Sequence, residues 1–174
     1  MLKIPIAKPR SKQNIIQMVK TLKSIIKFDD LNFPVCDFVE RDLASLDSTF
    51  TYDYVETSEL PKNTYAYYDP INNIMKIDEK VYLGACMGNP RDRFTIAHEI
   101  GHYFTTNEIM YARSESASLP AYMNPEWQAN VFAAELLMPS DKIQNMSENE
   151  IAERCNVSIT AASIALKNAK KPNH

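Results

Sequence analysis

The sequence predicts an α+β protein that is mainly helical and carries a small twisted sheet of about three strands. Apolar residues recur every three or four positions over most of the chain, whereas runs rich in β-branched and aromatic residues fall between residues 49 and 77. Only three of the 174 residues are glycine, which is few for an all-β architecture. The hydrophobic share of 45% and the length suit one globular domain over residues 1–174.

The N-terminal part, residues 1–60, is expected to hold two helices and the first strand. Ser11 has the side chain of a helix cap, and the helix it opens carries one apolar stripe between lysines. The stripe consists of Ile15, Val19, Leu22 and Ile26. A second helix is expected to begin near residues 32–34 and to run to about Ser45.

The sheet is predicted from three short segments. Residues 49–55, 64–69 and 74–77 have strand composition, and a turn at residues 70–73 joins the last two. The strand at residues 74–77 precedes the helix with the candidate site. We therefore expect its edge to be available for pairing with an extended peptide.

Two further helices begin with the same signature, an asparagine cap followed by proline. Asn89 opens a helix that is expected to reach about Phe104, and Asn124 opens a nearly all-apolar helix that continues to Met138. A helix so apolar is buried on most sides. The polar segment 105–123 between them is expected to be a loop over a site.

The C-terminal part, residues 141–168, is expected to form a helix pair. Ser147 and Glu150 have capping-box spacing, and Ser158 caps a last helix to about Asn168. The pattern also resembles a helix-turn-helix, but its second helix has few arginines or lysines. We therefore favour two packing helices over a DNA-binding unit.

Composition and sequence runs exclude several classes of protein. A net charge of -3 and a pI near 5.6 argue against bulk electrostatic capture of nucleic acid. No apolar run approaches the length of a membrane span, and residues 1–10 lack a signal-peptide core. The three cysteines lack CxxC spacing, so we expect reduced thiols and a cytoplasmic location.

The segment His98-Glu99-Ile100-Gly101-His102 carries the candidate chemistry. Histidines four residues apart project from one face of a helix, so His98 and His102 can both reach one zinc ion. Glu99 can act as the general base toward a metal-bound water. The alternative is a buried helix with two hydrogen-bonded core histidines, but two of the chain's three histidines fall in this motif.

A third protein ligand is still needed. The metzincin extension is absent because Thr105 and Glu108 stand where its glycine and third histidine would be. His174 is terminal, which makes it a poor ligand. A downstream carboxylate is therefore expected, and the candidates are Glu108, Glu115, Glu126 and Glu135.

Glu126 is the preferred third ligand. It begins the apolar helix and shares a face with Asn130, which can fix the tautomer of a ligand histidine. Glu135 lies about half a rotation away from it, so both cannot face one metal; a structural partner such as Arg91 or Arg93 is expected for Glu135. A first-turn glutamate favoured by the helix dipole is the alternative for Glu126.

Polar side chains near the motif are candidates for stabilising the oxyanion that forms when water attacks an amide. These candidates are Tyr103, Tyr111, Arg113 and Tyr122. Packing is the more frequent role of a tyrosine beside such a helix.

Two blocks of the sequence together resemble ImmA/IrrE family metallopeptidases. RFTIAHEIGHYF at residues 93–104 is similar to that family's active-site helix, and EWQANVFAAELLMP at residues 126–139 is similar to its second signature. The resemblance covers about residues 60–168. It implies a zincin-like fold with a gluzincin-like site in which His98, His102 and Glu126 bind Zn²⁺ and Glu99 is the acid/base. Gln128 departs from the family, because many relatives have a second glutamate there.

The resemblance further implies proteolysis inside bacteria, often of a helix-turn-helix repressor encoded with a mobile element. We therefore expect a cytoplasmic zinc endopeptidase that cleaves such a repressor. A protein that only sequesters a repressor, or a DNA-binding regulator that uses the C-terminal helices, are the alternatives.

Overall fold

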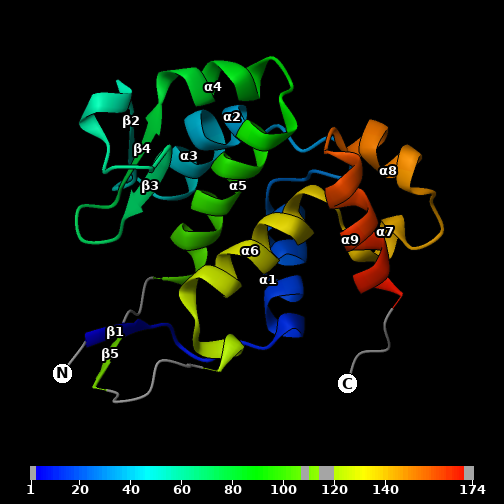
Figure 1. Ribbon diagram of the computed structural model, residues 1–174, viewed down its shortest axis with the longest axis horizontal. Coiled ribbons are helices and arrows are strands. Elements are labelled where there is room, and N and C mark those ends of the chain that lie inside the picture. Colours follow the sequence, from blue (N-terminus) through cyan, green and yellow to red (C-terminus); the bar gives the residue numbers. More distant parts are fainter. Residues whose placement is uncertain (1–2, 107–109, 114–119, 171–174) are drawn as a thin grey trace.

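The computed structural model describes residues 3–106, 110–113 and 120–170, and it has the predicted α+β architecture. Its main sheet contains β2 (Thr51–Val55), β3 (Ala66–Asp69) and β4 (Ile74–Asp78) in the order β2-β4-β3. β2 runs parallel to β4 and β3 runs antiparallel to it. The sheet lies at one end of the molecule, and the long helix α5 crosses beside it (Figure 1).

The expectation that residues 74–77 form an available sheet edge is wrong. β4 is the central strand, and its backbone pairs with β2 on one side and β3 on the other. β3 is the edge strand next to α5. Strand order depends on long-range pairing, which the alternation within one segment does not specify.

The N-terminal helices follow the prediction with one irregularity. α1 (Lys12–Ile25) begins after Ser11, whose side chain caps it, and the predicted apolar stripe faces the core, with its last member, Ile26, only partly buried. The second predicted helix is a continuous run of α2 (Val35–Asp37), a π-helical stretch η1 (Phe38–Leu43) and α3 (Ala44–Leu46). The π-helical turns bring Phe38, Val39 and Leu43 into the core.

Helix α4 (Glu79–Cys86) was not predicted. It begins directly at the end of β4, and the side chain of Asp78 caps it by accepting from the Lys80 amide. Its buried residues are only Val81 and Ala85, so its apolar stripe is too short to indicate a helix in the sequence. A turn through Gly88, with φ of 85°, then leads into α5.

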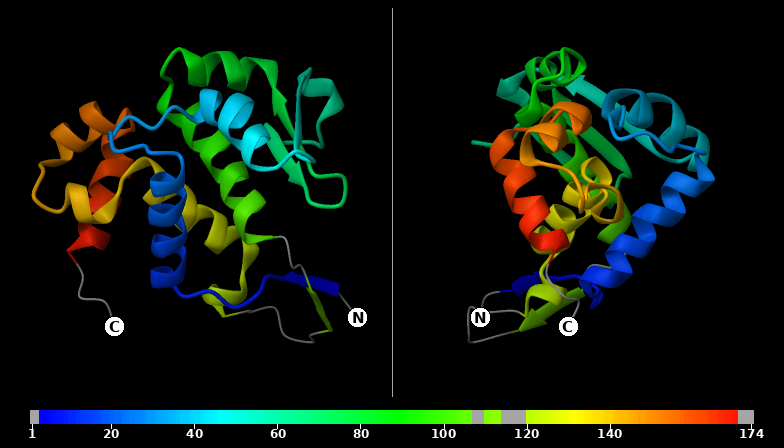
Figure 2. Two further views of the ribbon diagram at one scale, coloured as in Figure 1. Left: turned by 180° about the vertical axis from the view of Figure 1, so that it is seen from behind. Right: turned by 90° about the vertical axis from the view of Figure 1, so that its right-hand side faces the viewer.

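Helices α5 (Pro90–Thr105) and α6 (Pro125–Leu137) form the centre of the molecule. Asn89 and Asn124 cap them as predicted, each accepting hydrogen bonds from two amides of the first turn. The two helices pack very closely at Gly101, where an added Cβ would lie 2.7 Å from the Ala129 carbonyl oxygen. α1 packs against α6 and can be followed beside it in Figure 2.

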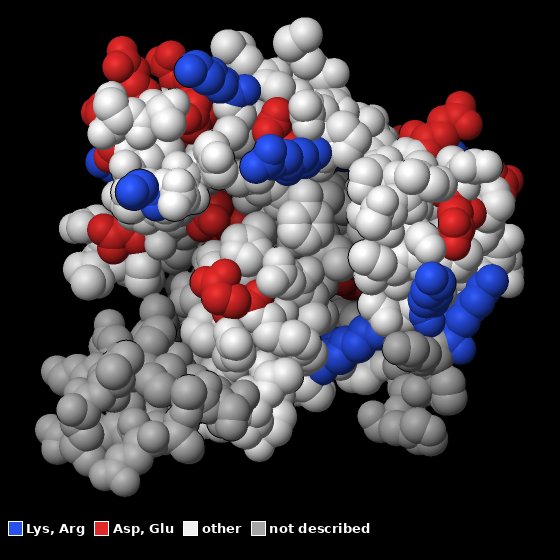
Figure 3. Space-filling view, in the orientation of Figure 1, with Lys and Arg blue, Asp and Glu red and all other residues white. Residues whose placement is uncertain are grey.

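The C-terminal helices α7 (Ser140–Ile143), α8 (Glu148–Cys155) and α9 (Ile159–Ala169) form a group on the other side of α6 (Figure 1). Ser147 makes the predicted capping box, and Asn156 ends α8 in the left-handed conformation. Ile151, Cys155, Ala162 and Leu166 are buried in the common core. α8 and α9 thus pack into the core, and Figure 3 shows Lys and Arg dispersed over the visible face, with one small group near the end of α9.

The described part of the connection between α5 and α6 is more regular than the predicted loop. It contains β5 (Met110–Arg113), which pairs antiparallel with the N-terminal strand β1 (Lys3–Ile6), and a 3-10 turn η3 (Ala121–Met123). The two short strands carry no sequence signal because each is stabilised by pairing with a partner about 100 residues away. No helix in the described ranges is long and apolar enough to cross a membrane.

Candidate metal centre

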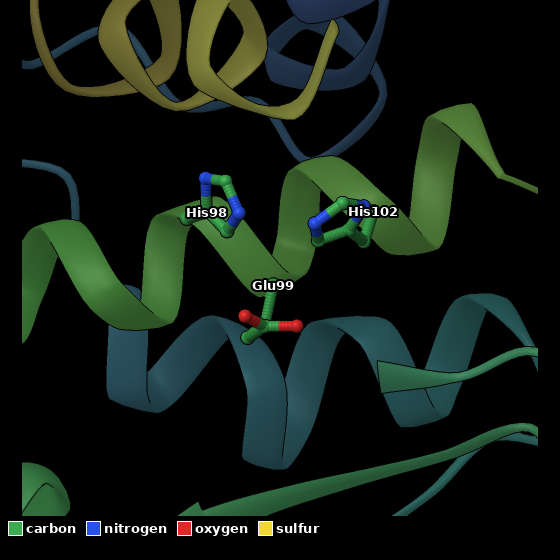
Figure 4. A group of neighbouring side chains, drawn as sticks. All are labelled: His98, Glu99 and His102. Carbon is green, nitrogen blue, oxygen red and sulfur yellow. The ribbon is translucent and has the colours of Figure 1, made fainter. Parts of the chain in front are cut away.

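His98 and His102 project from the same side of α5, as their spacing predicts (Figure 4). Their ring centroids lie 4.6 Å apart, and their side chains are only 17% and 14% exposed. Figure 4 shows Glu99 leaving the helix on a different side. The donor atoms of these three residues all lie within 4.8 Å of one another.

Glu126, in the first turn of α6, faces both histidines. Its two carboxylate oxygens lie 3.2 Å from His98 Nε2 and 3.3 Å from His102 Nε2. The side chain of Glu126 is 68% exposed, so the group opens to solvent on this side. The close contact at Gly101 and Ala129, one helical turn away, brings the two helices near enough for this approach.

Asn130 fixes the orientation of His98. Its side-chain oxygen lies 3.0 Å from His98 Nδ1, so this nitrogen carries the hydrogen and donates it. A neutral His98 ring then turns the lone pair of Nε2 toward the Glu126 carboxylate. The lone pairs of His98 Nε2 and of the Glu126 carboxylate oxygen repel each other at this separation unless a proton or a metal ion is bound to them.

The donor set fits a divalent metal. Two donors that are each about 2.0–2.1 Å from a tetrahedral zinc ion lie about 3.3–3.4 Å apart. The separations of 3.2 Å between Glu126 Oε2 and His98 Nε2 and of 3.3 Å between Glu126 Oε1 and His102 Nε2 are compatible with donors around one metal ion. Two imidazoles and one carboxylate suit zinc with one position left for water, although ferrous iron accepts the same set.

The environment shifts the pKa values of His98 and Glu126. Burial works against a charged imidazole at His98, but the hydrogen bond with Glu126 and the charges of Glu99 and Glu126 raise its pKa above the ordinary 6.5. Hydrogen bonds with His102 and His98 hold the pKa of the Glu126 carboxyl far below its ordinary value. Glu126 is therefore a carboxylate at neutral pH, which is the form that binds a metal.

Glu99 lies between α5 and the edge strand of the sheet. It is buried, and its Oε2 accepts a hydrogen bond of 2.8 Å from the Tyr68 backbone amide in β3. Burial raises the pKa of Glu99, while the nearby histidines work in the opposite direction. A carboxyl with a raised pKa suits a group that must both take up and give back a proton.

The Tyr68 amide was not predicted, since a backbone group leaves no mark in the sequence. Its orientation follows from the sheet register. Tyr65 pairs with Asp78 through a hydrogen bond from the Asp78 amide, so alternate residues of β3 direct their amides toward β4. Tyr68 falls on the other alternation and directs its amide toward α5.

Of the four oxyanion candidates, the structure describes the side chains of Tyr103 and Tyr122. The Tyr103 hydroxyl donates to Asp47 Oδ2 at 2.8 Å, and its ring packs against Phe50 and Tyr68. Tyr122 is exposed, and its carbonyl takes part in backbone contacts. The side chains of Tyr111 and Arg113 lie outside the described part of the chain, as do residues Glu108, Glu115 and His174.

Glu135 and Gln128 have structural roles on α6. The expected pairing of Glu135 with Arg91 or Arg93 is wrong, because its carboxylate accepts from the Ser140 amide and hydroxyl at the start of α7. Arg93 instead donates to backbone carbonyls, among them that of Phe33. Gln128 is fully buried and bonds to the backbone of Lys8 and Tyr122, so it does not face the histidines.

Comparison with known proteins gives one family match. The model of the family described as Peptidase_M78, IrrE N-terminal-like domain, matches residues 55–167. This range includes α5 and α6 with all four residues of the candidate centre. A search of curated proteins finds no match.

Proposed function

Because the chain belongs to the IrrE N-terminal-like peptidase family, we propose that it is a zinc endopeptidase that cleaves a regulatory protein inside the cell. The observation that carries the proposal is the approach of the Glu126 carboxylate to Nε2 of both histidines, which would place all three side chains within reach of one metal ion. His98, His102 and Glu126 are the proposed ligands, and Glu99 is the proposed acid/base. A helix-turn-helix repressor is the substrate class that the family resemblance suggests.

A zinc ion at these ligands would polarise the scissile carbonyl and lower the pKa of a bound water. Glu99 accepts a proton from the attacking water and delivers it to the leaving amine. The Tyr68 amide holds Oε2 in place, and we assign the proton transfer to the other carboxylate oxygen. Asn130 keeps the His98 ring in one tautomer and orientation during the reaction.

The edge strand β3 supports a way to orient the substrate. It lies beside α5, and its amide at Tyr68 already contacts Glu99. An extended peptide that pairs with the outward backbone groups of β3 not occupied by the Glu99 contact would run past the general base, and backbone pairing of this kind is common in peptide recognition. β3 thus replaces the central strand β4 in this role.

Glu99→Gln tests the catalytic role, since it keeps the shape of the side chain and removes its basicity. New protein N-termini should arise in cells that make the wild type and be absent from cells that make Glu99→Gln. The repressor encoded nearest to the gene is the first substrate to examine. Equal N-termini in the two strains, together with full biological activity of Glu99→Gln, would favour a protein that acts by sequestration.

A further inference from the structure

The segment Ala7–Arg10 runs beside the chain that leads into α6. Its backbone amides at Ala7 and Arg10 donate to the carbonyls of Met123 and Tyr122, both at 3.0 Å. The preceding strand β1 pairs with β5, so the N-terminal residues contact the α5–α6 connection at two places. These residues lie outside the range 55–167 that the family match covers.

Gln128 joins three segments through one side-chain amide. Its Nε2 donates to the carbonyls of Lys8 and Tyr122, both at 2.8 Å, and it is fully buried. The Arg10 guanidinium donates to Gln128 Oε1 at 3.3 Å and to the carbonyl of Thr105 at 2.8 Å. Both hydrogens and the oxygen of the amide are therefore engaged.

These contacts lie at the end of α5 and just before the start of α6, the two helices that carry the proposed metal ligands. Thr105 is the last residue of α5 and follows His102 by three positions. Tyr122 lies just before the cap of α6, and Glu126 follows in the first turn. Gln128 is about 200° around the helix from Glu126, so it faces away from the histidines and acts on them only through the backbone.

We propose that Arg10 and Gln128 are positioning residues that hold the first turn of α6 against the end of α5, so that Glu126 stays within reach of both histidines. This rests on the proposed metal centre and assigns a role to the N-terminal segment. The helices also touch at Gly101 and Ala129, and Ala129 lies about one turn further along α6 than Glu126.

Gln128→Met tests the proposal, because methionine has similar volume and removes all three hydrogen bonds. Zinc affinity should fall by about tenfold or more, as expected when a group that orients a ligand is removed. In a Glu126→Ala background, the same change should have little further effect, since the misplaced ligand is already gone. Gln17→Met, on the exposed side of α1, is the matched control and should keep wild-type affinity.

Trp127 provides a second readout that needs no metal. It is the only tryptophan of the chain, it lies next to Glu126, and it is partly buried. Quenching of its fluorescence by acrylamide should increase in Gln128→Met and in Arg10→Met at temperatures where circular dichroism shows a folded protein. Gln17→Met should be quenched like the wild type.

The outcomes separate this proposal from the proposed function. A wild type that binds no zinc would contradict the proposed metal centre. The quenching of Trp127 would still show whether Arg10 and Gln128 hold the first turn of α6 in place. If acrylamide quenched Trp127 in Gln128→Met no more than in the wild type, the positioning role of Arg10 and Gln128 would be refuted. An equal loss of zinc affinity with and without Glu126 also overturns the positioning role, because it would indicate general destabilisation.

Discussion

Gly101→Ala should loosen the packing of α5 and α6 at the centre of the proposed site. The new Cβ would lie 2.7 Å from the Ala129 carbonyl oxygen and 2.9 Å from Ala129 Cα. Both neighbours are backbone atoms that cannot rotate away. Since ordinary contact begins near 3.4 Å, the helices must separate by several tenths of an ångström.

The change in unfolding free energy caused by Gly101→Ala has two opposing contributions. Overpacking of this kind costs about 1–3 kcal/mol, and replacing a helical glycine by alanine returns up to about 1 kcal/mol. Because the obstruction is backbone, we expect the upper range, with a net loss of about 1–2 kcal/mol of unfolding free energy. His102 is the next residue, so the separation of its Nε2 from Glu126 should also grow beyond 3.3 Å.

Gly84→Ala in α4 is the matched control. Its Cβ would meet the carboxylate of Asp92, the far end of a flexible side chain that can turn aside. Thermal unfolding of the metal-free proteins measures the stability of the fold, and zinc titration against a competing chelator measures the affinity for zinc. Gly101→Ala should unfold at lower temperature than Gly84→Ala and bind zinc about tenfold more weakly or worse. If Gly101→Ala matched Gly84→Ala in stability and bound zinc like the wild type, the close packing would have no role in the site.

Two further predictions concern single side chains. Lys23 is mostly buried, its amine has no hydrogen-bond partner among the described residues, and burial lowers its pKa from 10.5 to about 8. Below pH 8 the charged form therefore destabilises the fold, so Lys23→Met should add about 1–3 kcal/mol at pH 7 after allowing for lost contacts with two aromatic rings. This gain should shrink as the pH rises from 8 toward 10.5 in chemical denaturation, and a gain independent of pH would contradict the assignment. Asn130→Ala should weaken zinc binding about 10- to 100-fold by freeing the His98 ring, whereas an unchanged affinity would show that the ring is held by other groups.

Local signals in the sequence predicted where five of the helices begin. Ser11, Asn89, Asn124, Ser147 and Ser158 all cap as expected, because a capping side chain acts within three residues of its own position. The same local rule places His98 and His102 on one side of α5. The meeting of Glu126 with these histidines also followed from the sequence, through helical faces and the family resemblance.

Features that depend on distant partners were not predictable in this way. The central position of β4 and the pairing of β1 with β5 come from backbone contacts between separate segments. The role of Gln128 depends on carbonyls of Lys8 and Tyr122, which any residue type can supply. Glu135 finds its partners at Ser140 rather than at an arginine, since a nearby helix start offers an amide and a hydroxyl.

Metal analysis of the purified protein tests the central claim most directly. The wild type should contain one zinc ion per chain by elemental analysis, Glu99→Gln should retain it, and His98→Ala and Glu126→Ala should lose it after brief dialysis against a chelator. Iron in place of zinc would leave the ligands standing and would contradict only the identity of the metal, because ferrous iron can also activate water. A wild type that holds no metal even after addition of zinc, or a Glu126→Ala variant that binds as tightly as the wild type, would contradict a centre shared by α5 and α6.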